Sequence, residues 1–233
     1  MIVLVTTCGI RKAHYLGRLL RQIDAGGWKG RRFIVSDGPP TIISGGWQVT
    51  ATTKREGQKK AYWRALAVGL EESRKSSDDR ILILEDDVEL CTNALRYMER
   101  ARLPVMLDFV TWFDGHVIPA GAAQGIYPVN AQYFFCLQGV TWKAATAEAL
   151  LTSSIAANWG ELHSGDILVA KILRGRRYGV HVPNLVQHLG SESICNPGQK
   201  LTGVRTSNNY PGAAFDASTL GTRDPGRRIV LSR

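Results

Sequence analysis

The sequence predicts an α/β protein made of a single domain, with a mostly parallel central sheet and helices on both of its faces. The chain opens as strand, helix and strand, over residues 2–7, 12–23 and 32–36. Such a βαβ unit joins two parallel strands through a helix that covers the sheet. Residues 81–84 read Ile-Leu-Ile-Leu, which is typical of a strand buried on both faces. At 233 residues and 44% hydrophobic composition, the chain can form one large core.

The boundaries of the first elements come from glycine and proline. Apolar residues at helical spacing fill 15–23, and Gly26-Gly27 ends that helix. Asp37-Gly38-Pro39-Pro40 is a turn signal that stops the second strand. Further along, we expect helices at 58–73, 93–102, 141–151 and 167–173, and strands at 80–84, 105–113, 132–137 and 178–182. Residues 114–130 are expected to form a long Gly/Pro loop.

The composition changes near the C-terminus. We expect the folded domain to cover residues 1–195, and 196–233 to be a basic tail rich in Gly, Pro, Ser, Thr and Asn. Such a segment is either a disordered end or a lid that orders over a ligand.

Bulk properties narrow the class of protein. The net charge of +9 favours a polyanionic partner, although solubility alone is an equal explanation. No run approaches the roughly 18 apolar residues that span a bilayer. The N-terminus has no basic region before its apolar part, so we expect a first strand instead of a signal peptide, and a cytoplasmic protein. The four cysteines lack CxxC spacing, which argues against a zinc site.

Three carboxylates, Glu85, Asp86 and Asp87, follow directly after the aliphatic strand. Ligands bind at the carboxyl ends of strands in open α/β sheets. Adjacent like charges repel one another, and a bound cation relieves that repulsion. Carboxylate oxygens suit Mg²⁺ or Mn²⁺, which commonly bridge a protein to a diphosphate. The alternative is a solvated acidic loop after a core strand.

The order of these features resembles the nucleotide-sugar glycosyltransferases with the GT-A (Rossmann-like) fold. Glu85-Asp86-Asp87 resembles their DxD motif, in an EDD form, and Gln138-Gly139-Val140 resembles their glycine loop. Ser164-Gly165-Asp166 resembles their xED motif, with glycine in place of the middle acid. The stretch 182–190, Val-Pro-Asn-Leu-Val-Gln-His-Leu-Gly, looks like a P-S-L-x-Q-H-x-G segment found in several of them.

The resemblance implies roles for particular residues. A divalent ion, Mn²⁺ or Mg²⁺, would be held by Asp87, Glu85 and His188, and Gly139 would lie near the donor sugar. Asp166, at a helix N-terminus, would act as general base in an inverting transfer. The donor would be a UDP-sugar. The departure at Gly165 bears on the base assignment.

Residues around the first two strands are candidates for binding the nucleotide. Asp37 could accept hydrogen bonds from uracil or ribose, although an Asp-Gly pair is also an ordinary turn. The other candidates are Thr6, Thr7, Arg11, Lys54, Arg55, Lys59 and Asp86. Any one of the cations could instead belong to a solvated helix edge.

The sequence gives weaker evidence for the acceptor than for the sugar donor. Basic residues interleaved with aromatics at 54–64, 171–177 and 200–233 suit a nucleic acid. The chain more weakly resembles phage glycosyltransferases that modify hydroxymethylated pyrimidines in DNA, which implies a flipped base as acceptor. A saccharide of cell-envelope assembly, a metal-dependent nucleotidyltransferase and a non-enzymatic nucleic-acid-binding module are the alternatives.

Overall fold

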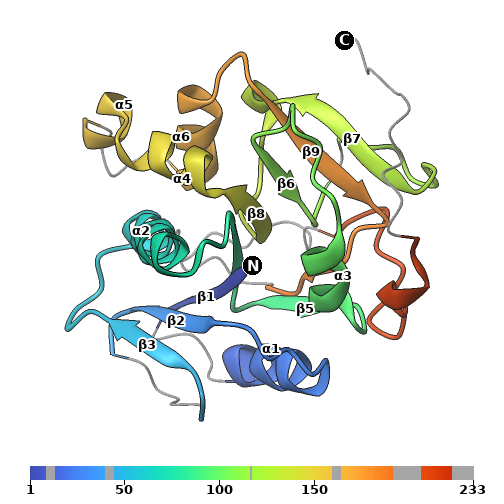
Figure 1. The fold of residues 1–233 in the computed structure, drawn as a ribbon, viewed down its shortest axis with the longest axis horizontal. Coiled ribbons are helices and arrows are strands. Elements are labelled where there is room, and N and C mark those ends of the chain that lie inside the picture. Colours follow the sequence, from blue (N-terminus) through green and yellow to red (C-terminus); the bar gives the residue numbers. More distant parts are fainter. Residues whose placement is uncertain (9–13, 40–44, 116, 159–163, 191–205, 222–233) are drawn as a thin grey trace.

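The α/β class, the mostly parallel sheet and the helices on both faces are confirmed by the computed structural model, which describes residues 1–8, 14–39, 45–115, 117–158, 164–190 and 206–221. Among the described residues, one sheet has eight strands in the order β3-β2-β1-β4-β8-β6-β9-β7 (Figure 1). They are β1 Ile2–Cys8, β2 Arg32–Asp37, β3 Gln48–Ala51, β4 Arg80–Glu85, β6 Phe109–Thr111, β7 Gly125–Asn130, β8 Gly139–Lys143 and β9 Arg177–Val182. All run in one direction except β7 and β8, which pair antiparallel with their neighbours.

Helices cover both faces of this sheet (Figure 1). On one side lie α1 His14–Ala25 and α3 Ala94–Arg100, and on the other α2 Gln58–Ser76, α4 Ala144–Leu151 and α6 Gly165–Ile172. The short α5 Ser154–Ala157 contacts α6. A separate two-stranded sheet pairs β5 Val88–Leu90 with β10 Val186–His188. The single turns η1 Ala131–Tyr133 and η2 Ala217–Thr219 complete the described elements.

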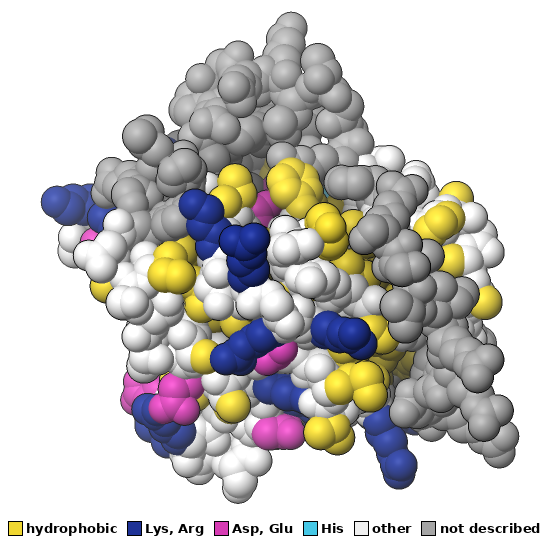
Figure 2. All heavy atoms as spheres, turned by 90° about the horizontal axis from the view of Figure 1, so that it is seen from above, with side chains coloured by type: hydrophobic (Ala, Val, Ile, Leu, Met, Phe, Trp, Pro, Cys, Tyr) yellow, Lys and Arg dark blue, Asp and Glu magenta, His cyan; other side chains and the backbone are white. Residues whose placement is uncertain are grey.

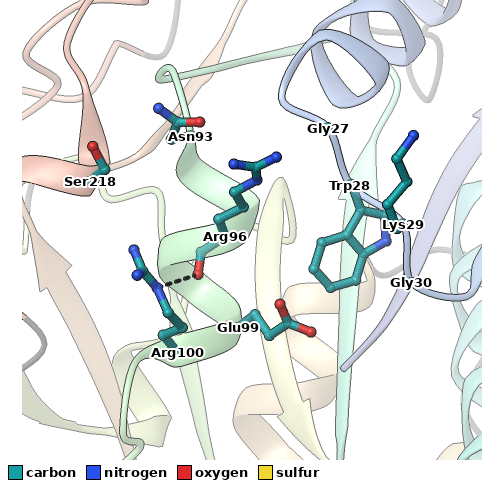
Figure 3. A pocket seen from close by; sticks show the side chains of 9 residues that line it. All are labelled: Gly27, Trp28, Lys29, Gly30, Asn93, Arg96, Glu99, Arg100 and Ser218. Atoms are coloured by element: carbon teal, nitrogen blue, oxygen red, sulfur yellow. Dashed lines mark hydrogen bonds between the residues drawn. The ribbon is translucent and has the colours of Figure 1, made fainter.

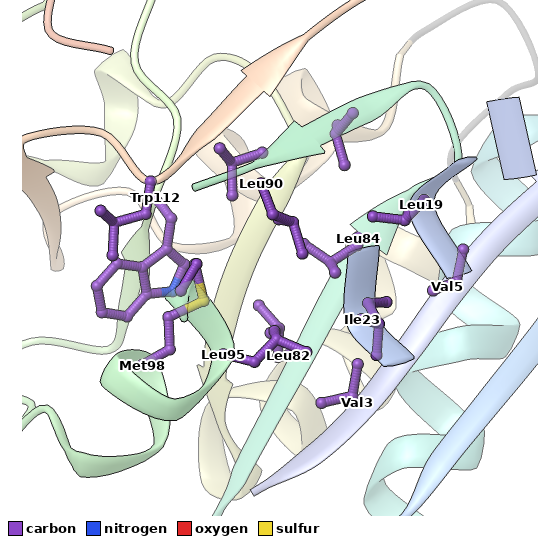
Figure 4. Close-up of a cluster of buried hydrophobic side chains, with 14 of the residues drawn as sticks. Val3, Val5, Leu19, Ile23, Leu82, Leu84, Leu90, Leu95, Met98 and Trp112 are labelled. Atoms are coloured by element: carbon purple, nitrogen blue, oxygen red, sulfur yellow. The ribbon is translucent and has the colours of Figure 1, made fainter. Parts of the chain in front are cut away.

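Alternate residues of the central strands pack into the two hydrophobic cores on opposite faces of the sheet. Val3 and Val5 of β1 pack with Leu19 and Ile23 of α1 (Figure 4), whereas Leu4 points to the side of α2. Successive side chains of a strand point to opposite faces, so an uninterrupted aliphatic strand fills two cores at once. This is the physical reason that the apolar run before the carboxylates is central to the fold.

Three expectations about the middle of the chain were wrong. The helix predicted from 141 begins only at Ala144, because residues 141–143 belong to β8 and pair with β4 and β6. The predicted strand at 132–137 is a turn of 3₁₀ helix followed by irregular backbone, because the ring of Phe134 packs edge-on against Phe109 and Tyr178 and Cys136 adopts a positive φ of 92°. The predicted loop at 114–130 contains β7, an edge strand that includes Pro128. Proline is tolerated at sheet edges, where no ladder hydrogen bond is lost.

Residues 206–221 of the predicted tail lie against the domain. The backbone N–H of Thr92 donates to the carbonyl of Ala213 over 3.1 Å, and that of Asn184 donates to Asn209 over 3.0 Å. The segment therefore follows α3 and the start of β10. Within the described part of the chain, no helix is both long and apolar enough to cross a membrane.

His181 of β9 is a titratable group inside the core. It is 1% exposed, its ring packs against Tyr97 and Trp112, Nδ1 donates to the carbonyl of Pro183 over 2.7 Å, and Nε2 accepts from the hydroxyl of Tyr97 over 2.9 Å. Burial lowers the pKa of His181 to about 4, against an opposing contribution from the Pro183 hydrogen bond. The folded protein therefore holds this imidazole neutral.

This burial predicts an acid sensitivity. Above pH 6.5 the ring is neutral in both states, so its contribution to stability is constant. As pH falls from 6.5 towards 4, only the unfolded chain binds the proton, and the folded state should lose about 3 kcal/mol. Urea unfolding of the wild type and of His181→Gln across this range measures the difference. Equal slopes of unfolding free energy against pH would contradict the prediction.

Candidate active site

The carboxylates lie at the point where the strand order reverses. β2 lies on one side of β1 and β4 on the other, and all three strands run in parallel. Connections that leave in opposite directions open a crevice at the carboxyl ends of such strands. Glu85, Asp86 and Asp87 are at this edge and are 2–5% exposed, so they are not a solvated loop. The hydroxyl of Thr7, at the end of β1, donates to Asp86 Oδ2 over 2.5 Å.

Asp87 and His188 meet through the small sheet. β5 pairs antiparallel with β10 so that Val88 faces His188, and the N–H of Leu189 donates to the carbonyl of Asp87 over 2.8 Å. This register brings His188 Nε2 to 3.2 Å from Asp87 Oδ2, although the two residues are 101 positions apart. A Cβ on Gly190 would lie 2.5 Å from that carboxylate oxygen, so only glycine fits beside the pair.

The donor set of this pair fits a small divalent cation. Ligands about 2.1 Å from one ion at right angles lie about 3 Å apart, close to the observed Nε2–Oδ2 separation. With Nε2 as the ligand the ring proton would lie on Nδ1, which is buried and has no hydrogen-bond acceptor among the described residues, so the fit depends on the Asp87–His188 spacing and not on this atom. Mg²⁺ and Mn²⁺ sites commonly use one or two protein ligands together with water and substrate phosphates.

Glu85 does not join this pair. Its carboxylate accepts hydrogen bonds from the side-chain amides of Gln58 and Gln138, the latter over 3.2 Å. Within the described ranges, no group of three or more His, Cys, Asp or Glu side chains is placed to hold a metal. The predicted set of three ligands is therefore brought together only as Asp87 and His188.

Asp166 lies in the first turn of α6 and is 6% exposed. Its Oδ2 accepts from the N–H of Cys136 over 3.2 Å, and its Oδ1 accepts from Ile167 over 2.9 Å. The carboxylate is thereby fixed in orientation. A Cβ on Gly165 would lie 2.9 Å from Leu137, so glycine in place of the acid lets the helix pack closely on the preceding segment.

The segment 136–138 connects the base candidate to the acidic strand end. Cys136 contacts Asp166, while the carbonyl of Gln138 accepts from the N–H of Glu85 over 3.2 Å. Gln58 was missed as a site residue in the sequence, and Gln138 was noted only as part of the glycine loop. Gln138 precedes the glycine that starts β8, and Gln58 is the first residue of α2, so position beside a strand end or a helix start was the available signal.

Asp37 lies at the same edge of the sheet as the carboxylates, and both of its oxygens already accept hydrogen bonds. Its two oxygens accept from the backbone N–H groups of Glu56 over 2.7 Å and Gly57 over 3.0 Å, and the Arg55 guanidinium lies 3.9 Å away. Asp37 is 2% exposed and ties the loop before α2 to the end of β2. A contact with uracil or ribose would have to be made in addition to this structural role.

The remaining predicted nucleotide contacts divide into three groups. Lys54 is exposed and Lys59 half-buried, and each is two residues from Glu56 or Gly57, whose N–H groups donate to Asp37. The hydroxyl of Thr6 is used within the sheet, where it donates to the carbonyl of Leu84 over 3.3 Å. Arg11 lies outside the described residues.

Gly139 has a packing explanation. It is buried at the start of β8, and a Cβ there would lie 2.9 Å from Val186 of β10. Because Val186 occupies the space over its Cα, this glycine lets the small sheet approach the large one. The expectation that Gly139 contacts a donor sugar through this face is not supported by its surroundings.

Comparisons with known proteins add little to this geometry. No protein-family model and no curated protein matches the chain. Among solved structures, the galactosyltransferase LgtC in complex with donor and acceptor sugar analogues is 13% identical, with a TM-score of 0.49 over 78% of this chain and 72% of that one. An active-site mutant of LgtC gives the same identity and coverage and a TM-score of 0.47. Similarity at this level does not assign an activity.

Proposed function

We propose that this chain is a metal-dependent, inverting glycosyltransferase of the GT-A type that moves a sugar from a UDP-sugar to a hydroxyl acceptor. The observation that carries the proposal is the buried Asp87–His188 pair, formed by β5 and β10 beside the switch point of the sheet. A purely structural role does not explain why three consecutive carboxylates are buried there, since each loses hydration.

Asp87 and His188 would hold Mn²⁺ or Mg²⁺ through Oδ2 and Nε2. When bound, the ion neutralises charge on the leaving diphosphate. Asp86, oriented by the hydroxyl of Thr7, is proposed to position the nucleoside. Lys54, Arg55 and Lys59 are proposed to meet the phosphates from the edge beside Asp37.

Asp166 is the proposed base. An acceptor hydroxyl is a weak acid, so its proton must leave as the new bond forms to the anomeric carbon. In the balanced step, the acceptor oxygen bonds to that carbon, the bond to the diphosphate breaks, and the proton passes to a carboxylate oxygen of Asp166. Each oxygen accepts one hydrogen bond from the main chain, from Cys136 or Ile167, and keeps a second lone pair for the acceptor.

A hydroxymethylated base in DNA stays a prediction for the acceptor. The cations at 54–64 lie towards the carboxylate edge, but Arg176 and Arg177 follow α6, which carries Asp166 at its other end, about 12 Å away for an eight-residue helix. The stretch 200–233 is largely outside the described residues. If DNA is the acceptor, a duplex should be retarded in a gel at low salt and released at high salt. No retardation at low salt would end the idea.

A screen of nucleotide sugars tests the proposed function directly. UDP-sugars with Mn²⁺ should raise the melting temperature and be slowly hydrolysed, and chelator should abolish both effects. As a control, the variant Asp79→Asn, which lacks a carboxylate that is 88% exposed, should respond to the UDP-sugars and Mn²⁺ as the wild type does. Conversion of a nucleoside triphosphate to an activated sugar would instead identify a nucleotidyltransferase. No response to any UDP-sugar would overturn the assignment.

A further inference from the structure

Cations gather at the edge of the sheet opposite the candidate active site. β4 begins at Arg80 and β9 at Arg177, while the antiparallel β8 ends at Lys143. We call this surface the basic edge. Its cations are Arg80, Arg100, Arg102, Lys143, Arg176 and Arg177, and its acids are Asp78, Asp79, Glu99 and Asp108. Figure 2 looks down on the end of the molecule that is uppermost in Figure 1, where β9 begins, and shows Lys and Arg side chains interspersed with hydrophobic ones and with some Asp and Glu.

Two apolar side chains project from this edge. Val105 is 95% exposed and Met106 68% exposed, at the tip of a turn closed by the N–H of Leu107 on the carbonyl of Pro104 over 3.1 Å. We call these two residues the apolar tip. Leu107 is 1% exposed and anchors the turn in the core.

The apolar tip is held in place by the surrounding cations. Lys143 Nζ donates to the carbonyl of Val105 over 2.7 Å, and an Arg80 guanidinium N–H donates to that of Ala101 over 3.0 Å. Arg176 pairs with Asp108 over 3.0 Å, and the N–H of Asp108 donates to the carbonyl of Arg177 over 2.9 Å. The projection is therefore a fixed feature, and the edge around it carries more cations than acids.

A pocket adjoins the basic edge at Arg100. It has a volume of about 520 Å³ and lies between α3 and the loop that follows α1. Lys29, Arg96 and Arg100 line it, with Glu99 as its acid, and the indole of Trp28 faces α3 across the opening (Figure 3). Three cations around a cavity of this size suit a phosphorylated headgroup.

We propose that the basic edge docks on an anionic membrane surface, with the apolar tip entering the interface and the surrounding cations meeting lipid phosphates. A bilayer interface accepts apolar and cationic side chains together. A nucleic-acid backbone would match the charge but leave Val105 and Met106 uncovered. A symmetric contact with a second copy would bring like charges face to face. Strands of six residues would hold the carboxylate edge roughly 20 Å from the surface.

Vesicle sedimentation of the full chain tests this proposal. The protein should bind vesicles of phosphatidylcholine mixed with phosphatidylglycerol, and bind phosphatidylcholine alone far less. Replacing both tip residues, Val105→Ser with Met106→Ser, should weaken binding about thirtyfold, because the apolar burial is lost. Arg102→Gln, on the basic edge, or Arg96→Gln, in the adjoining pocket, should each weaken it about fivefold, and added salt should weaken it further.

Matched controls come from the rest of the surface. Val49→Ser changes another exposed apolar residue, 36% exposed on β3, and Lys60→Gln removes an exposed cation from the first turn of α2. Neither should alter vesicle binding, and unchanged melting temperatures would show that all variants fold. Wild-type protein that stays in the supernatant with anionic vesicles overturns the proposal. The proposal is also overturned if the tip and arginine variants bind vesicles as the wild type does and lose only duplex binding, or only a dimer.

Discussion

Asp87→Asn is expected to lower kcat/KM for sugar transfer by at least about a hundredfold. Asparagine keeps the shape of the side chain but removes the negative charge next to His188 Nε2, 3.2 Å away in the wild type. The same variant should lose the rise in melting temperature that Mn²⁺ and a UDP-sugar produce together. That second measurement separates the loss of a ligand from a general loss of activity.

The folded state should tolerate this change. Asp87 is one of three adjacent buried carboxylates, and removing a like charge relieves repulsion in the absence of a cation. Circular dichroism melting without metal should therefore show no loss of stability. Asp79→Asn, at an 88% exposed carboxylate, controls for the chemical substitution. Full wild-type activity in excess chelator would exclude a metal role for Asp87.

Asp166→Asn is expected to reduce kcat by roughly 10²–10⁴-fold, the range in which a general base contributes. The amide has one oxygen, which can still accept from either Cys136 or Ile167, so one of the two hydrogen bonds that fix the start of α6 is kept. It cannot take the proton of the acceptor hydroxyl. The KM for the donor should change little, because the proposed base acts on the acceptor.

A second capping aspartate provides the matched control for Asp166. Asp216 accepts from the N–H of Ser218 over 2.9 Å at the start of η2 and lies outside the candidate site. Asp216→Asn should leave kcat unchanged. A kcat for Asp166→Asn within a few-fold of wild type would remove Asp166 as base and leave it as a helix cap only.

Local sequence patterns predicted β1, β2 and β4 well because their physical signal is local, whereas β8, at the centre of the sheet, was missed because residues from 141 were expected to form a helix. The aliphatic run before Glu85 indicates a strand buried on both faces, and the acids that follow indicate where the strand ends. β5 and β10 have three residues each and carry no periodicity of their own. Their pairing joins segments about a hundred positions apart, so the contact between Asp87 and His188 could be expected only from the family resemblance.

Two glycines show the same limit of prediction from local sequence patterns. Gly139 and Gly165 were noted in the sequence as parts of motifs, but packing explains both. Val186 fills the space over the first, and Leu137 lies close to the second. A one-letter pattern cannot tell whether a glycine makes room for a ligand or for a neighbouring side chain.

By itself, the sequence determined the α/β class, the buried central strand and the acids that follow it, because hydrophobic periodicity and turn residues act over a few positions. Only the tertiary structure decided which of those acids meets the histidine, that Glu85 is held by two amides, and that the strand-start cations lie opposite the carboxylates. These outcomes depend on strand order and register, which arise from contacts between distant parts of the chain.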